Sequence, residues 1–168
     1  MLRELHQELG IPDNYGNNGL RPHYKEATEL VDVEPNIIGL MQRLTPKTAI
    51  SWVKMKEAAK KDGKTLILVS GFRSIEYQAN LIRKKIYAGQ SVRKILSVNA
   101  APGYSEHHTG RAIDVASPGS RPLTEEFELS DAYRWLTTNA IRFGFSMTYP
   151  RNNEQGFVFE PWHWTKSR

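Results

Sequence analysis

The stretch from Tyr104 to Asp114 constrains this chain most, because it places a histidine and a carboxylate on either side of a glycine, directly before an apolar run. His107 and Asp114 are seven residues apart. On one unbroken strand, an odd separation would point the two side chains to opposite faces. We therefore expect the chain to bend at Gly110, with His107 in a loop and Asp114 on a short strand over residues 112–116.

A second polar segment, Glu160-Pro-Trp-His163, lies further along the sequence. Pro161 lacks a backbone donor and pushes Glu160 toward an extended conformation, so a helical His-Glu-x-x-His arrangement is excluded. We expect His163 to bind a metal from a bent strand end, with Glu160 beside the metal rather than on it. Together the two segments supply two imidazoles and two carboxylates. This set suits a hydrolytic zinc centre with three protein ligands, an open position and one carboxylate that moves a proton.

Each of these side chains also has a structural explanation. A lone histidine is more often structural than metal-bound, and Asp114 could pair with Arg111 or cap a turn. His108 competes with His107 for the ligand role, since only one of two adjacent side chains on an extended segment can point at the ion. The joint occurrence of the two segments favours a metal site over these explanations.

The composition limits what the site can be. The 168 residues include no cysteine, so a metal must be held by histidine and carboxylate rather than by thiolate. The length and the 39% hydrophobic content fit one domain that folds without disulfides. A net charge of +5 suits an anionic substrate, but the basic residues are scattered, so we expect no nucleic-acid partner. No window approaches the ~20 apolar residues of a membrane span.

Capping residues and apolar periodicity predict an α+β fold. We expect a small antiparallel sheet that carries the zinc site, with helices packed on it. The predicted helices cover residues 46–62, 74–88 and 130–143, and the predicted strands cover residues 65–70, 112–116, 145–149 and 157–159, the last two as a hairpin. Residues 90–103 are expected to be a connection. Residues 1–45 are expected to form an irregular lead-in packed on a catalytic domain of residues 46–168, which gives a single domain overall.

Three blocks of the sequence resemble the VanY-type D-alanyl-D-alanine carboxypeptidases. They are Ser70-Gly-Phe-Arg-Ser74 with Gln78, Gly103-Tyr-Ser-Glu-His-His-Thr-Gly-Arg-Ala-Ile-Asp114, and Glu160-Pro-Trp-His163. These enzymes are zinc metallopeptidases that share a fold with lysostaphin-type enzymes and the hedgehog signalling domain. The blocks follow one another in order between residues 45 and 165.

The resemblance implies a role for each site residue. It implies that Glu160 is the catalytic base and that Arg73 polarises the scissile carbonyl and stabilises the oxyanion. It implies Zn²⁺ on three ligands, which are His107, Asp114 and His163. The neighbouring His108 is then not a ligand.

The resemblance also implies a substrate. Ser105, Gln78 and Ser74 align with positions that line the substrate site, and the implied substrate is a peptidoglycan stem peptide in the cell envelope. A D,D-carboxypeptidase would remove its C-terminal D-alanine, and we expect it to act as a monomer. Within the same family, an L,D-carboxypeptidase, an endopeptidase and a dipeptidase are alternatives. A non-catalytic zinc module, as in the hedgehog domain, is a further alternative, against which the presence of both Glu160 and Arg73 argues.

Overall fold

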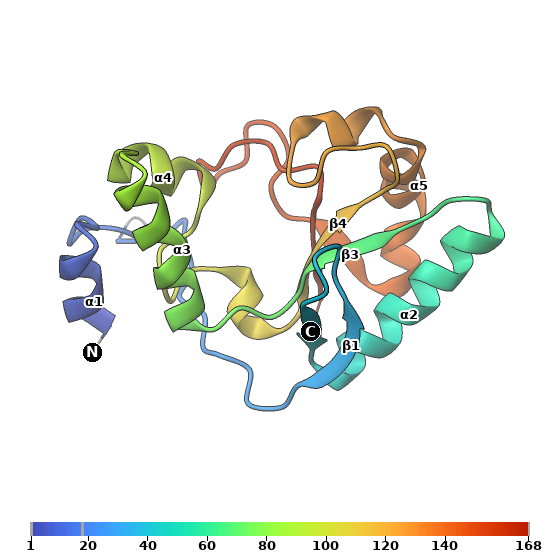
Figure 1. Cartoon of the computed structure of the whole chain (residues 1–168), viewed down its shortest axis with the longest axis horizontal. Helices are drawn as coiled ribbons and strands as arrows, with labels where there is room; N and C mark the ends of the chain where they lie inside the picture. Colours follow the sequence, from blue (N-terminus) through green and yellow to red (C-terminus); the bar gives the residue numbers. More distant parts are fainter. Residues whose placement is uncertain (1, 18, 168) are drawn as a thin grey trace.

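The computed structural model describes residues 2–17 and 19–167, which form two antiparallel sheets surrounded by helices (Figure 1). In the larger sheet the strand order is β3-β4-β6-β5, with β3 (Ile67–Ser70), β4 (Ala112–Ala116), β6 (His163–Lys166) and β5 (Phe145–Met147). Each neighbouring pair is antiparallel, and the register places Asp114 directly opposite His163. The two polar segments of the sequence are thereby brought side by side.

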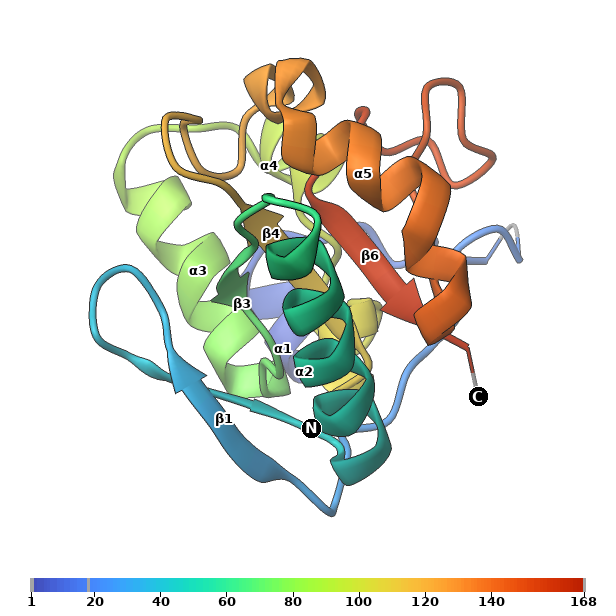
Figure 2. The same ribbon diagram turned by 90° about the vertical axis from the view of Figure 1, so that its right-hand side faces the viewer.

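The side chains of β4 alternate between two faces, as expected for a strand. Ile113 and Val115 join a hydrophobic core that includes Trp52 from α2 (Pro46–Lys61) and Trp135 from α5 (Asp131–Asn139). Figure 2 shows α2 and α5 in front of this sheet. Asp114 lies between Ile113 and Val115 and therefore faces away from this core. The opposite face of the sheet carries the predicted metal ligand Asp114.

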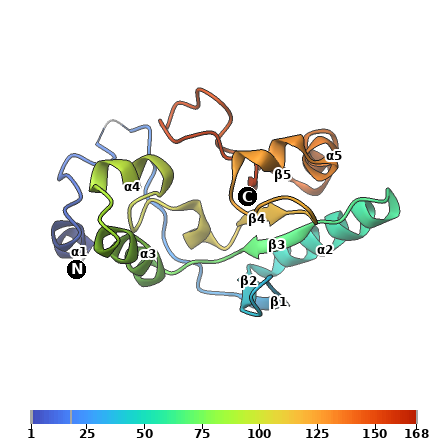
Figure 3. The same ribbon diagram turned by 45° about the horizontal axis from the view of Figure 1, so that its top comes forward.

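The remaining helices form a second group on the other side of the strands (Figures 1 and 3). They are α1 (Leu2–Glu8), α3 (Ile75–Tyr87) and α4 (Val92–Val98). Ala79 and Ile82 of α3 pack with Ile95 of α4 in a separate buried cluster, which also contains Leu9 from the turn after α1. The face of the sheet that carries Asp114 is directed toward α3 and α4, since Gln78 of α3 and Val98 of α4 line one cavity together with His163.

The α+β class and most of the predicted elements are confirmed. The helices predicted at 46–62 and 74–88 correspond to α2 and α3. The helix predicted at 130–143 corresponds to α5 together with the 3₁₀ turn η3 (Ala140–Phe143) that follows it. A further 3₁₀ turn, η2 (Glu125–Leu129), precedes α5. Ser74 and Ser130 cap their helices, because their Oγ atoms accept hydrogen bonds from the backbone N–H groups of Tyr77 (3.0 Å) and Tyr133 (3.1 Å). Gly63, Gly89 and Gly144 follow the three predicted helical segments in left-handed backbone conformations.

The predicted hairpin between residues 145–149 and 157–159 is wrong. β5 pairs with β6 instead, and residues 157–159 belong to no strand. The backbone amides in this segment have other partners, since Val158 N–H donates to the Ser97 carbonyl (3.2 Å) and Glu160 N–H to the Tyr149 carbonyl (3.0 Å). Phe157 and Phe159 are buried and Val158 between them is exposed, so the segment has the alternating pattern of a strand although it pairs with none.

The description of residues 1–45 as irregular is also wrong. This region contains α1 and a two-stranded sheet, β1 (Val31–Pro35) with β2 (Met41–Leu44). Asn36 closes the hairpin, because its Oδ1 accepts hydrogen bonds from the N–H groups of Ile38 and Leu40, and its Nδ2 donates to the Val69 carbonyl on β3 (3.1 Å). α4 was missed as well, within the expected connection 90–103. The division into a lead-in and a catalytic domain stays a prediction.

Candidate metal centre

Gly110 makes the expected bend between His107 and Asp114. It ends the 3₁₀ turn η1 (Glu106–Thr109) with φ of 63°, a left-handed conformation that favours glycine. A Cβ at this position would also lie 2.9 Å from a methyl carbon of Leu30. The bend brings His107 Nε2 to 3.2 Å from Asp114 Oδ1, although the two residues belong to different elements.

His163 completes a group of three buried side chains. It begins β6, opposite Asp114, and its Nδ1 lies 3.0 Å from Asp114 Oδ1. One ligand atom from each of His107, Asp114 and His163 lies within 4.8 Å of the others, and each residue is at most 3% exposed. The edge of a tetrahedron with zinc bonds of ~2.0–2.1 Å is about 3.3 Å, which is close to the 3.2 and 3.0 Å that separate Asp114 Oδ1 from the two histidine nitrogens.

The second nitrogen of each imidazole is held by a protein acceptor. His107 Nδ1 donates to the Gly71 carbonyl (2.6 Å), and His163 Nε2 donates to Glu106 Oε2 (2.8 Å). Metal-binding histidines in proteins usually have such a partner, which fixes the tautomer and the ring orientation. The arrangement therefore directs His107 Nε2 and His163 Nδ1 toward a shared metal.

His108 points elsewhere. Its Nδ1 donates to the Arg73 carbonyl (2.6 Å) and its Nε2 accepts from Gly103 N–H (3.0 Å). The two histidines lie on a 3₁₀ turn rather than on an extended segment, so the geometric reason expected from the sequence is wrong. The contacts nevertheless support His107 as the ligand and give His108 a different task, that of holding the Arg73 backbone.

The two imidazoles differ in their electrostatics. Burial and the nearby Arg73 cation together lower the pKa of His107 to about 4. Burial also acts to lower the pKa of His163, but hydrogen bonds to Asp114 and Glu106 raise it to about 10. The pKa of Asp114 is held far below its usual range by the two histidines, despite its burial. Two buried carboxylates, Asp114 and Glu106, thus stay charged beside the histidines, and the metal-free site balances them with the cationic His163.

Glu160 lies beside this group with its carboxylate free of the metal ligands. It is 8% exposed, and among the described residues no donor makes a side-chain hydrogen bond to it. Burial raises its pKa to about 7, and the charge of Asp114 adds to the rise, whereas His163 opposes it. A carboxylate with a pKa near neutrality is suited to accept and return a proton.

This raised pKa predicts a stability effect for the metal-free protein. The folded state favours the neutral form of Glu160. The stabilisation from this preference is fully present below about pH 4.5, and it is lost as the pH rises through about 7. Glu160→Gln has no charge to bury. Its advantage over the wild type in the free energy of unfolding should therefore grow by on the order of 2 kcal/mol between pH 5 and pH 8. Urea unfolding of both proteins at the two pH values measures this change, and an equal difference at both would contradict the buried ionisation.

Arg73 reaches the same place from the junction between β3 and α3. Its backbone N–H donates to the His107 carbonyl (3.2 Å), and one guanidinium nitrogen lies 3.8 Å from Asp114 Oδ2. The Nε of Arg73 is buried and has no hydrogen-bond partner among the described residues. The guanidinium therefore has donor capacity left for a group that enters the site.

A cavity of about 30 Å³ joins these residues, and it has room for a water molecule. Arg73, Glu160, His107 and His163 line it, and so do Ser105 and Gln78 among the predicted substrate residues. Gln78 Nε2 donates to the Ala100 carbonyl (2.8 Å), which leaves its buried Oε1 without a partner among the described residues. Ser74 is not among the lining side chains, because its Oγ is the cap of α3.

The sequence did not single out two residues that the structure places at the site. Glu106 contacts His163, as described above, and the ring of Tyr149 stacks on His163 with centroids 4.7 Å apart. Glu106 stands next to His107 in the sequence, so its proximity could have been expected. Nothing in the sequence pattern around Tyr149 indicated its position.

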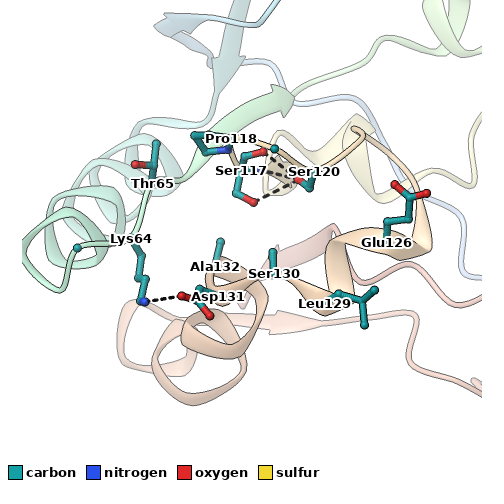
Figure 4. Close-up of a pocket in the computed structure, with 12 residues that line it drawn as sticks. Lys64, Thr65, Ser117, Pro118, Ser120, Glu126, Leu129, Ser130, Asp131 and Ala132 are labelled. Carbon is teal, nitrogen blue, oxygen red and sulfur yellow. Dashed lines mark hydrogen bonds and ion pairs between the residues drawn. The ribbon is translucent and has the colours of Figure 1, made fainter.

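A larger hollow of about 620 Å³ lies between the loop that follows β4 and the start of α5 (Figure 4). None of the predicted site residues lines it. Four of its polar side chains are paired with one another, since Lys64 Nζ is 2.8 Å from Asp131 Oδ2 and the hydroxyls of Ser117 and Ser120 are 3.2 Å apart. We assign no chemistry to this hollow.

Residues 41–165 match the protein family described as VanY, D-alanyl-D-alanine carboxypeptidase. The chain belongs to the VanY family. The resemblance inferred from the three sequence blocks is thereby confirmed, and with it the expectation of a zinc metallopeptidase fold. Among the described helices, none combines the length and the apolar character that crossing a bilayer requires.

Individual relatives of the VanY family agree with this assignment. The putative carboxypeptidase YodJ of Bacillus subtilis (strain 168) is 33% identical over 97% of this chain, which spans 58% of YodJ. The structure of the LD-carboxypeptidase LdcB has a TM-score of 0.74, with 34% identity over 86% of this chain and 71% of that one. A variant of the vancomycin-resistance D,D-pentapeptidase VanY, solved in complex with Zn(II), has a TM-score of 0.63, with 28% identity over 84% of this chain and 82% of that one.

Proposed function

We propose that this chain is a zinc-dependent D,D-carboxypeptidase that removes the C-terminal D-alanine from peptidoglycan stem peptides. The observation that carries the proposal is the convergence of a His-Asp-His group, a carboxylate with a pKa near 7 and a guanidinium on one small cavity. A purely structural metal site needs neither Glu160 nor Arg73. Their presence therefore supports an enzyme rather than a zinc-containing binding module.

Each residue of the site has a task in this reaction. Zinc held by His107, Asp114 and His163 would supply a Lewis acid that polarises the scissile carbonyl and activates a water for attack. Glu160 accepts the proton of the attacking water and returns it to the nitrogen of the leaving D-alanine. Arg73 donates a charge-assisted hydrogen bond to the oxygen that becomes negative in the transition state. Ser105 and Gln78 line the cavity where they can orient the peptide.

The main alternative is an L,D-carboxypeptidase with the same site. The similarity to LdcB supports this alternative, since LdcB is an LD-carboxypeptidase. An endopeptidase or a dipeptidase of the same family would also use these residues. These activities differ in the stereochemistry before the cleaved bond, in the need for a free terminal carboxylate and in the length of the peptide.

Defined stem peptides separate these activities. A pentapeptide that ends in D-Ala-D-Ala, a tetrapeptide that ends in a single D-Ala, and the pentapeptide with an amidated C-terminus would be incubated with the zinc-loaded protein. Mass spectrometry of the products should show loss of one alanine from the free pentapeptide and much slower cleavage of the other two. Preferred cleavage of the tetrapeptide would instead establish the L,D activity. Fast cleavage of the amidated peptide would point to an endopeptidase.

We propose the cell envelope as the place of action, because the proposed substrate lies there. We also propose that the chain acts as a monomer, since all the residues with assigned tasks come from one chain. Sedimentation of the purified protein at several concentrations checks the monomer.

A further inference from the structure

Glu106 is a buried carboxylate for which the proposed mechanism has no task. It is 7% exposed, and its Oε2 accepts hydrogen bonds from His163 Nε2 (2.8 Å) and from Thr165 Oγ1 (2.5 Å). These bonds lie on the side of His163 that faces away from Asp114. Glu106 is thus close to the metal centre without offering a ligand to it.

The local geometry explains why these groups meet. His107 and Glu106 are neighbours on η1, and His163 and Thr165 are two residues apart on β6, so their side chains lie on the same face of that strand. Each segment therefore provides one proposed metal ligand, His107 or His163, and one side chain that contacts His163 on its Nε2 side, Glu106 or Thr165. The Glu106 carboxylate joins the two segments, because it comes from η1 and accepts hydrogen bonds from His163 and Thr165 of β6.

A third segment reaches Glu106 from the N-terminal part of the chain. The hydroxyl of Tyr24 donates to Glu106 Oε1 (3.3 Å). Backbone bonds hold this segment in place, since Tyr24 N–H donates to the Gly103 carbonyl and Ala27 N–H to the His108 carbonyl, both at 2.7 Å. Tyr24 precedes residues 41–165, which match the VanY family.

We propose that Glu106 is a positioning residue for the metal ligand His163, and that Tyr24 brings the N-terminal segment into the same hydrogen-bond network. A carboxylate that accepts from Nε2 fixes the imidazole with Nδ1 toward the metal and makes Nδ1 a better donor to it. The hydroxyls of Thr165 and Tyr24 hold the carboxylate in its orientation. The inference rests on the proposed metal site and not on the choice between D,D and L,D activity.

The first test is zinc affinity, measured by competition with a chelating dye. Glu106→Gln keeps the size of the side chain but removes the charge, and we expect it to weaken zinc binding about 10- to 100-fold. Thr165→Val and Tyr24→Phe each remove one hydroxyl and should weaken it by about 2- to 10-fold. The matched controls are Glu57→Gln and Tyr87→Phe, which alter an exposed carboxylate and an exposed phenol and should bind zinc like the wild type.

A second readout separates positioning from simple destabilisation. With Co²⁺ in place of zinc, Glu106→Gln should shift the visible absorption bands of the metal, because the geometry at His163 changes, whereas the two controls should keep the wild-type spectrum. A Glu106→Gln protein with wild-type zinc affinity and spectrum would overturn the proposal, even if its unfolding midpoint were lower. Wild-type affinity in Tyr24→Phe would overturn the part assigned to the N-terminal segment. A wild-type protein that binds zinc but cleaves no stem peptide would count against the proposed function only.

Discussion

Glu160→Gln is expected to lower the turnover number by about 10²- to 10⁴-fold while the zinc content and the affinity for substrate stay near wild type. The side chain lines the same cavity as the proposed ligands His107 and His163 and is outside the candidate ligand group, so its removal should leave the metal in place. Proton transfer is needed only in the transition state, and its loss therefore appears in kcat rather than in KM. Steady-state kinetics and metal analysis on one preparation measure both quantities.

Two other roles for Glu160 make different predictions. If the carboxylate merely orients a neighbour such as Trp162 or Arg73, the neutral glutamine should cost only a few-fold of activity. If it binds the metal, Glu160→Ala should lose zinc. Glu154→Gln is the matched control, because Glu154 is exposed and lies six residues earlier on the same segment. Near-normal turnover in Glu160→Gln would remove this residue from the mechanism.

His107→Ala and His163→Ala are each expected to lose both zinc and activity, whereas His108→Ala should keep the zinc. Only two protein ligands remain in the first two variants, which is too few for a tight zinc site. His108→Ala removes the support of the Arg73 carbonyl instead, so its kcat should fall while the metal stays bound. Zinc stoichiometry after dialysis against a weak chelator distinguishes these outcomes.

His108 is buried, so its substitution also affects folding. His108→Gln keeps a donor and an acceptor and serves as a milder variant of the same position. Zinc loss in His108→Ala and also in His108→Gln, with a folded protein by circular dichroism, would show that the ligand assignment is wrong.

The sequence predicted the parts of the fold that local chemistry determines. Ser74 and Ser130 could be recognised as helix caps because their side chains bind amides three residues away. The bend at Gly110 followed from the odd spacing of His107 and Asp114. The two polar segments could be joined into one candidate site because their combined side chains match the needs of zinc.

The parts that failed depend on distant contacts. The hairpin assigned to residues 145–149 and 157–159 was wrong because β5 pairs with β6, and the amides of Val158 and Glu160 bind the carbonyl groups of Ser97 and Tyr149. The β1–β2 hairpin was missed because Asn36 stabilises it partly through β3. The contact of Glu106 with His163 was missed for a similar reason, since the two residues are 57 positions apart, although the place of Glu106 beside His107 could have been expected. No local pattern reports such contacts.

The central claim is that one metal ion, held by His107, Asp114 and His163, is required for peptide hydrolysis. The most direct measurement is to strip the protein with a chelator, titrate zinc back, and follow cleavage of a D-Ala-D-Ala-terminated pentapeptide in the same samples. We expect activity to be lost on stripping and to rise linearly to a plateau at one zinc per chain. A folded, metal-free protein that takes up no zinc and still cleaves the peptide would contradict it.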